Sequence, residues 1–580
     1  MVNVKNASQN IDLKERKCYT NERGDEMEKP QLQNAIRVNH RGFLPNSEKR
    51  FVLVENKTQG LEFSVYLIDD VIEKKVFDGV MTPIVEGDAV YYVGDLSSII
   101  KEGDYYIIAG GFKSRQLVIY KDAYDICQRM MSEYFVYQRC GSPLGWHGEC
   151  HLDDGYIYET GERVDLSGGY HQSCDLRKSV GGVSIGVLSM MQFALKDKSQ
   201  WGKIRLPEEI KWACDYYVKT IQENGAMYNT LNTPHGWGGR VFYKSPAPSS
   251  AQWNVTSILA TGSLFFKEKD STLAEKYLSA ALRSYNFMKG AERPRGVYRH
   301  PEKYPMGMDP DFFYDQCEIG SVADVALEIT ASCNMYKACG CEYYLENAKN
   351  LLPRLLEALD GFVLLRGGKG SRTVTSSCSY SWLMGGLFTL CDAYELLGDI
   401  CGLKGKIVHA LEDICEFMNR FVFKKARRLY AECDLDAECG HCGETYRQAI
   451  GKTGVYREYS YALGESFEPS IACYIGAFTA RASRLVGMKQ YLSCAQAIAD
   501  DLLGGNELDS CHIRGIGYNN PQSSAYGQFF PSTPFIPGAV GVGYHTVDVY
   551  SHSSEYDMPC VGLAMYLLSE IKESYNEKME

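Results

Sequence analysis

The sequence of 580 residues lacks three features, and each absence narrows the function. It has no apolar run that reaches the roughly 20 residues a membrane-spanning helix needs, so we expect no membrane partner. It lacks an excess of positive charge: a net charge of −12 argues against nucleic acid and anionic membrane surfaces as partners. Its first residues lack the apolar segment of a secretory signal peptide.

Cysteine, by contrast, is abundant. The chain holds 21 cysteines, an odd number, and without a secretory signal they fit reduced thiols better than a framework of disulfides. We therefore predict a cytoplasmic protein. Residues 1–33 are polar and charged, and we expect a disordered leader there that carries no function.

Four potential metal ligands occur in one short stretch of the chain. Cys140, Cys150, His151 and His171 follow the spacing C-x9-C-H-x19-H. Thiolate and imidazole are ligands that Zn²⁺ prefers, and four protein ligands make a closed, structural site. The spacing is looser than that of a zinc finger, so buried reduced cysteines beside ordinary histidines stay an alternative. A metal that fixes His171 would also fix the loop that carries Asp175, four residues further on.

The apolar pattern divides the chain into two folded parts. Over residues 34–120, short β-rich runs alternate with turns about every ten residues, which is typical of an all-β sandwich of immunoglobulin-like size. From residue 121 the apolar period becomes that of a helix. We therefore predict a leader over 1–33, an immunoglobulin-like sandwich over 34–120 and a helical domain over 121–580.

Twelve helices are predicted in the helical domain, and several form tight antiparallel pairs. Six helical hairpins are therefore expected. The predicted ranges are 121–138, 182–196, 207–224, 251–268, 271–289, 317–338, 342–360, 379–397, 403–422, 468–486, 488–504 and 558–575.

Aromatic residues and glycines are concentrated in the long stretches between predicted helices, such as 225–250 and 290–316. A pyranose presents an apolar face of C–H bonds that an aromatic ring can cover. For each ring, core packing or loop anchoring is the alternative to sugar binding. The candidates for sugar contact are Trp146, Trp237, Tyr243, Trp253, Tyr314 and Trp382.

A second group of potential ligands lies within ten residues. Cys433, Cys439, His441 and Cys442 could bind another metal, or the last two cysteines could form a redox pair. In a chain this rich in cysteine, bystander thiols are the preferred interpretation.

The stretches around the first Cys/His group resemble the family-9 glycoside hydrolases, the cellulase family, of the subgroup with an N-terminal immunoglobulin-like domain. The matching residues are Y-Q-R-C-G…H-G-E-C-H-L-D-D and V-D-L-S-G-G-Y-H, and I-R-V-N-H-R-G-F-L-P resembles the opening of the accessory domain. The resemblance implies a structural zinc at the four positions and helical hairpins that close into an (α/α)6 barrel. It also implies an accessory domain that packs on the barrel as a support, with sugar binding as the alternative.

The resemblance implies a catalytic base as well. The family's D-A-G-D, whose second Asp is the base, is here Gln172-Ser173-Cys174-Asp175. The base position is therefore Asp175, whereas Gln172 replaces the helper carboxylate. An amide can still hydrogen-bond the attacking water, but it cannot share the proton or contribute charge.

The general acid of the family matches Glu555, in the stretch S-S-E-Y-D-M-P. A register without a gap would place Ser551 there and leave no acid, and Asp548 and Asp557 are alternative carboxylates. In an inverting hydrolase the base and acid stand roughly 6.5–9.5 Å apart, which leaves room for water.

The resemblance implies inverting hydrolysis of β-linked oligosaccharides, which we expect to be gluco-configured. The missing signal peptide and the altered site residues lead us to predict exo action inside the cell. The family's P-H-H-R is replaced by P-Q-S-S, which removes a His and an Arg that contact substrate and favours an altered substrate site. Two alternatives stay open: a catalytically silent carbohydrate-binding relative and a zinc-dependent enzyme. We expect a monomer or a small homo-oligomer.

Overall fold

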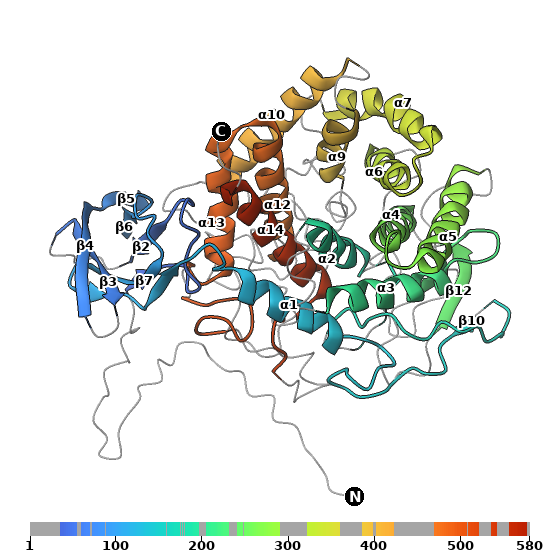
Figure 1. Ribbon diagram of the computed structural model, residues 1–580, viewed down its shortest axis with the longest axis horizontal. Coiled ribbons are helices and arrows are strands. Elements are labelled where there is room, and N and C mark those ends of the chain that lie inside the picture. The colour runs from blue at the N-terminus through green and yellow to red at the C-terminus, as the bar shows by residue number, and fades with distance from the viewer. Residues whose placement is uncertain are drawn as a thin grey trace, which may run out of the picture.

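The computed structural model has a β domain beside a larger helical domain (Figure 1). The predicted leader lies outside the residues that the structure describes. These are residues 35–54, 60–69, 72–86, 89–157, 159–173, 176, 178, 180–181, 183–196, 205–230, 241–246, 249–290, 322–359, 386–397, 402–422, 469–506, 509–520, 535–541 and 556–576.

The β domain is a sandwich of two antiparallel sheets. One sheet has the strand order β1-β2-β6-β5, and the other has the order β4-β3-β7-β8, with β9 also paired to β7. Phe63, Val65 and Leu67 alternate with less buried residues along β3 and pack in the core with Phe51 and Ile107. The strands are β1 (Ile36–Arg37), β2 (Arg50–Leu53), β3 (Glu62–Asp69), β4 (Ile72–Val80), β5 (Thr82–Glu86), β6 (Ala89–Asp95), β7 (Gly103–Ala109), β8 (Phe112–Lys113) and β9 (Leu117–Ile119).

The helical domain is a barrel of helices in two concentric layers. Helices α14, α2, α4, α6, α9 and α12 each contact the next, and α12 contacts α14, so they close an inner ring. The helices are α1 (Asp125–Tyr137), α2 (Ser184–Lys196), α3 (Leu206–Thr220), α4 (Ser249–Phe266), α5 (Ser271–Lys289), α6 (Val322–Cys339), α7 (Glu342–Leu359), α9 (Phe388–Leu397), α10 (Lys404–Val422), α12 (Pro469–Val486), α13 (Leu492–Leu502) and α14 (Met558–Asn576).

Burial separates the two layers. Every residue of the inner helix α4 except Leu264 is buried, because other helices cover it on all sides. The outer helix α10 buries one apolar stripe, Ile407, Leu411 and Ile414. The ring closes where α2 and α14 touch at glycines: a β carbon on Gly562 would lie 2.1 Å from the Gly186 carbonyl oxygen.

The predicted fold class, an immunoglobulin-like sandwich followed by an (α/α)6 barrel, is confirmed, and each predicted helical range overlaps a helix of the structure. The range 488–504 begins with a single 3-10 turn, η6 (Lys489–Tyr491), before α13. A small sheet of β10 (Tyr156–Ile157), β11 (Tyr228–Thr230) and β12 (Val241–Pro246) was not predicted. Its strands are too short to show a period in the sequence.

The β domain contacts the barrel through a buried histidine. His40 Nε2 lies 2.9 Å from Asp509 Oδ1, and His40 Nδ1 accepts a hydrogen bond from the Tyr518 backbone N–H. Arg115 donates to the other Asp509 oxygen at 3.0 Å. Gly504 leaves room for the imidazole, since a β carbon there would lie 2.4 Å from the ring. The two domains therefore share a packed, hydrogen-bonded interface, as expected of a supporting domain.

Candidate active site and metal centre

Two backbone hydrogen bonds bring the Cys/His segments together after α1 ends. The Cys140 N–H donates to the Gly169 carbonyl, and the His171 N–H donates to the Gln138 carbonyl, both at 2.9 Å. Gly169 has a φ of 74°, and a β carbon there would lie 2.6 Å from the Tyr216 ring. The Gly-Gly pair before Tyr170-His171 is therefore required by this turn and by its packing on α3.

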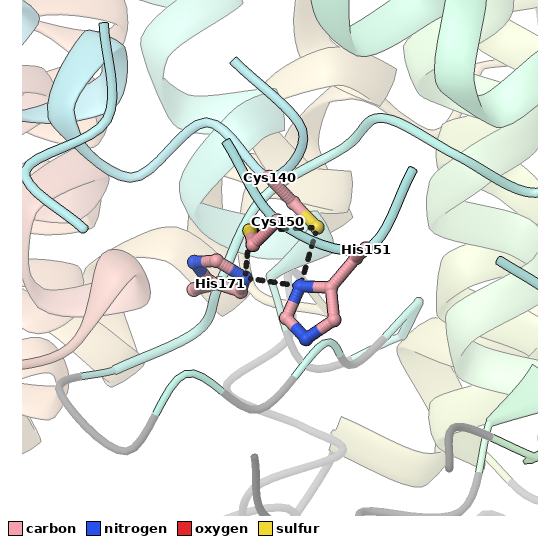
Figure 2. Close-up of side chains that lie close together, drawn as sticks. All are labelled: Cys140, Cys150, His151 and His171. Carbon is pink, nitrogen blue, oxygen red and sulfur yellow. Dashed lines mark hydrogen bonds between the residues drawn. The ribbon is translucent and has the colours of Figure 1, made fainter. Parts of the chain in front are cut away.

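The side chains of Cys140, Cys150, His151 and His171 converge on one point (Figure 2). Neighbouring ligand atoms are 3.0–3.9 Å apart, and all four lie within 4.8 Å of one another. Metal–sulfur and metal–nitrogen bonds of about 2.3 and 2.0–2.1 Å at a tetrahedral ion give ligand–ligand distances of about 3.3–3.8 Å. The cluster could therefore hold a metal ion with four ligands.

The electrostatics of His171 and Cys150 suit a metal. Burial lowers the pKa of His171 to about 4, so its imidazole is neutral at pH 7. Hydrogen bonds lower the pKa of Cys150 to about 2, and the one with Cys140 has the largest effect. Burial raises the pKa of Cys140. Neutral imidazole and thiolate are the forms that bind metals.

Buried polar contacts support the extended segment that carries His171. Arg139 pairs with Glu209 on α3, and the Tyr170 hydroxyl donates to the same carboxylate at 2.9 Å. The Trp212 indole donates to the Gly169 carbonyl at 2.9 Å. His171 therefore lies on a segment that α3 holds in place.

The same segment then pairs with the chain that precedes α14. The Met558 N–H donates to the Gln172 carbonyl at 3.0 Å, and Ser173 forms an antiparallel bridge with Asp557. Asp175 and Glu555 lie outside the described residues, as does Asp548. Their sequence neighbours on the two segments nevertheless lie side by side.

Gln138, which sequence reasoning missed, connects this segment to α1. Its buried amide N–H donates to the carbonyl of Ser173 at 3.2 Å and to the Tyr134 hydroxyl at 3.1 Å. Its amide oxygen accepts from the Trp146 indole at 3.0 Å. The only signal in the sequence is its place two residues before Cys140.

The predicted sugar-contact residues have different surroundings. Trp146 is half-buried, and its indole N–H holds Gln138. Trp253 is fully buried on α4 and donates to Asp324 at 2.9 Å. The prediction for Trp253 is therefore wrong, because a ring with no exposed face packs in the core and cannot cover a sugar.

The other predicted residues lie partly inside and partly outside the described part of the chain. The side chain of Tyr243 and the whole of Trp237, Tyr314 and Trp382 lie outside the described part of the chain. Gln172 is half-buried, and Asp557 is buried. The second group of potential ligands, Cys433, Cys439, His441 and Cys442, also lies outside the described residues.

Comparisons with known families match both domains. The model described as glycosyl hydrolase family 9 matches residues 124–526, and the model described as cellulase N-terminal ig-like domain matches residues 31–114.

Curated relatives of the chain are named as a cellodextrinase and endoglucanases. A cellodextrinase of Butyrivibrio fibrisolvens is 29% identical over 357 residues, which cover 56% of this chain and 62% of the relative. Endoglucanase D of Acetivibrio thermocellus is 26% identical over 362 residues, which cover 55% of this chain and 54% of the relative. The matches thus span little more than half the length of these two relatives.

Solved structures share the fold. AaCel9A in complex with cellobiose-like isofagomine has a TM-score of 0.67 at 17% identity, with 93% of this chain and 100% of that chain covered. A Zn-binding triple mutant of a family-9 endoglucanase has a TM-score of 0.66 at 17% identity, with 92% and 100% covered. Identities this low show the fold alone.

Proposed function

The chain belongs to glycosyl hydrolase family 9, and from this membership we propose that it hydrolyses β-linked gluco-oligosaccharides of the cellodextrin type with inversion. The observation that carries the proposal is the pairing of Gln172 and Ser173 with Asp557 and Met558. It joins the segment that continues to Asp175 with the segment that follows Glu555. The names of the relatives, cellodextrinase and endoglucanase, support the substrate class.

The chemistry needs two carboxylates with different protonation states. Asp175, ionised, takes a proton from the water that attacks the anomeric carbon, and Glu555, protonated, donates to the leaving oxygen. The hydrogen bond from Met558 to the Gln172 carbonyl fixes the backbone just before the base. The Gln172 side chain would accept or donate a hydrogen bond to the water without adding charge.

We further propose that the Cys/His cluster binds structural Zn²⁺. Four ligand atoms at tetrahedral spacing fill the positions of one ion, so no position among them is left for a catalytic water. The bound ion would supply charge neutralisation for the thiolates and a fixed orientation for His171. The arrangement therefore disfavours the zinc-dependent enzyme that the sequence left open.

Exo action and a cytoplasmic location are also proposed. None of the thirteen cysteines among the described residues forms a disulfide, which supports a reducing compartment. No helix in the described ranges is long and apolar enough to cross a membrane. Cell fractionation tests the location, and the product pattern from longer cellodextrins tests exo action.

A panel of cellodextrins, with the anomeric products followed by NMR, tests the activity. We expect the wild-type enzyme to release α-anomers first, and Asp175→Asn to lose hydrolysis but still bind sugar, because the amide cannot accept the proton. Glu555→Gln should lose most activity on cellodextrins and less on activated aryl glycosides, which need little protonation. Binding without hydrolysis by the wild type would instead support the silent relative, which the replacement at Gln172 favours.

A further inference from the structure

Lys178 and Asp154 form a buried ion pair near the candidate active site. The Lys178 ammonium lies 3.0 Å from Asp154 Oδ2, and the two side chains are 2% and 3% exposed. The ammonium also donates to the Leu166 carbonyl at 2.7 Å and lies over the rings of Tyr216 and Phe242. Neither partner belongs to the Cys/His cluster or to the proposed acid/base pair.

The ion pair connects the two segments that supply the histidines of the cluster. Asp154 follows His151 by three residues, and its N–H donates to the His151 carbonyl. Lys178 follows His171 by seven residues. In the sequence, Asp175 therefore stands between two residues with buried, bonded side chains, His171 before it and Lys178 after it.

A buried ion pair is a costly way to hold two segments together. Removing charges from water costs several kcal/mol per ion, and well-packed apolar residues often stabilise a fold as well or better. The two side chains are 2% and 3% exposed, so this cost applies here. What an ion pair adds over apolar contact is one defined geometry for donor and acceptor.

We propose that Lys178 and Asp154 are positioning residues that hold the Asp175 segment in its catalytic conformation. This inference rests on the proposed role of Asp175 as the base. Neither residue is placed in contact with substrate. Without the ion pair, the described part of the chain between Asp175 and Lys178 keeps the buried side chain of Leu176 but loses its charged anchor, so the rate of the chemical step falls while substrate binding changes little.

A second ion pair on the same loop supplies a matched control. Lys219 on α3 lies 2.9 Å from Asp165 Oδ2 and donates to the Ser167 carbonyl at 3.1 Å. The side chains of Lys219 and Asp165 are 35% and 67% exposed, and neither residue adjoins Asp175 in the sequence. Lys219→Met therefore removes a Lys–Asp contact of this loop without releasing the proposed base.

The test compares Lys178→Met, Asp154→Asn, the apolar double variant Asp154→Leu/Lys178→Met and Lys219→Met. Steady-state kinetics on cellotetraose gives kcat and KM, metal analysis gives zinc content, and hydrogen exchange followed by mass spectrometry reports on peptides over 172–177. We expect kcat to fall by about 10- to 100-fold at nearly constant KM, since a displacement near 1 Å can cost that much. Exchange in these peptides should rise, and the control should match the wild type.

The double variant separates positioning from stability. If the apolar replacement restores the melting temperature but kcat stays low and exchange stays fast, the ion pair positions the segment. If the double variant regains wild-type kcat and exchange, or if exchange is unchanged in all variants, the inference is overturned. A wild-type protein without hydrolysis would refute the proposed function, and the exchange rates would still decide whether the ion pair orders the segment.

Discussion

His151 adopts a backbone conformation that a residue with a β carbon rarely takes. Its φ is 58°, in the left-handed region, and such residues cost about 1–3 kcal/mol and persist where the surroundings enforce them. This conformation directs the His151 imidazole toward Cys140, to which its Nδ1 lies at 3.1 Å. The energetic cost fits a ligand whose orientation matters more than local stability.

Replacement of one thiol should therefore release the metal. We expect Cys150→Ser to bind less than one tenth of the wild-type zinc and to lower the melting temperature by several degrees, because metal binding adds to folding free energy. Inductively coupled plasma analysis and calorimetry check both. Cys341→Ser, at an exposed thiol outside the cluster, is the control and should change neither. Equal zinc in both variants would contradict the assignment.

Gln172 marks the clearest departure from the family's site. We expect Gln172→Asp to raise kcat on cellodextrins, because a second carboxylate can share the proton of the attacking water. It should also move the acidic limb of the pH–rate profile to higher pH, since a nearby negative charge raises the pKa of Asp175. Lower activity with an unshifted limb would mean that the amide is matched to a different substrate.

At the scale of elements, the indole of Trp146 helps connect the end of α1 to the segment that carries Ser173. The Trp146 N–H donates to the buried Gln138, which holds Ser173. We expect Trp146→Phe to keep KM and to lower the free energy of unfolding by about 1–3 kcal/mol, because it leaves the Gln138 oxygen without its donor. Denaturant unfolding and kinetics measure the two quantities. A large rise in KM at unchanged stability would instead assign Trp146 to the sugar.

Local periodicity predicted the helices, but not the contacts between elements. Ile407, Leu411 and Ile414 reveal α10 because one apolar stripe repeats at helical spacing. In α4 nearly every position is buried, so no apolar period in the sequence indicates which face Trp253 occupies. The Cys/His cluster was found because its ligands form a spaced motif.

The partners of Lys178 and Gln138 escaped prediction because they are distant in the sequence. Lys178 meets Asp154 across 24 residues, and Gln138 meets Ser173 across 35. Both contacts depend on how loops cross, which no local pattern encodes. The positions of the proposed acid and base came from resemblance alone, and they stay predictions.

At the scale of the whole molecule, acid should weaken the contact between the domains. Burial raises the pKa of Asp509, but hydrogen bonds from His40 and Arg115 outweigh it and hold that pKa below its usual value. A carboxyl group with a lower pKa in the folded state stabilises the fold at pH values above its unfolded pKa of about 3.9. This stabilisation is lost as the pH falls through the folded pKa.

Asp509→Asn should therefore be less stable than the wild type at pH 7, by about 1–3 kcal/mol. The difference should shrink as the pH falls below about 4, where the wild-type carboxyl takes up its proton. Thermal unfolding between pH 7 and pH 3 measures it. Asp153→Asn, at a carboxylate with a 76% exposed side chain, should follow the wild type at every pH. A difference that stays constant with pH would rule out this linkage.

The glycine contact between α2 and α14 has a consequence for synthesis of the chain. The inner ring closes only when its last helix, α14, packs against its first, α2. Because the ribosome releases the N-terminal part first, about 360 further residues separate the end of α2 at Lys196 from the start of α14 at Met558. The segment before α14 pairs with the segment before α2 at that same moment. A nascent chain therefore cannot assemble its candidate active site early, and a chain cut short before Glu555 loses the proposed acid along with the closure of its barrel.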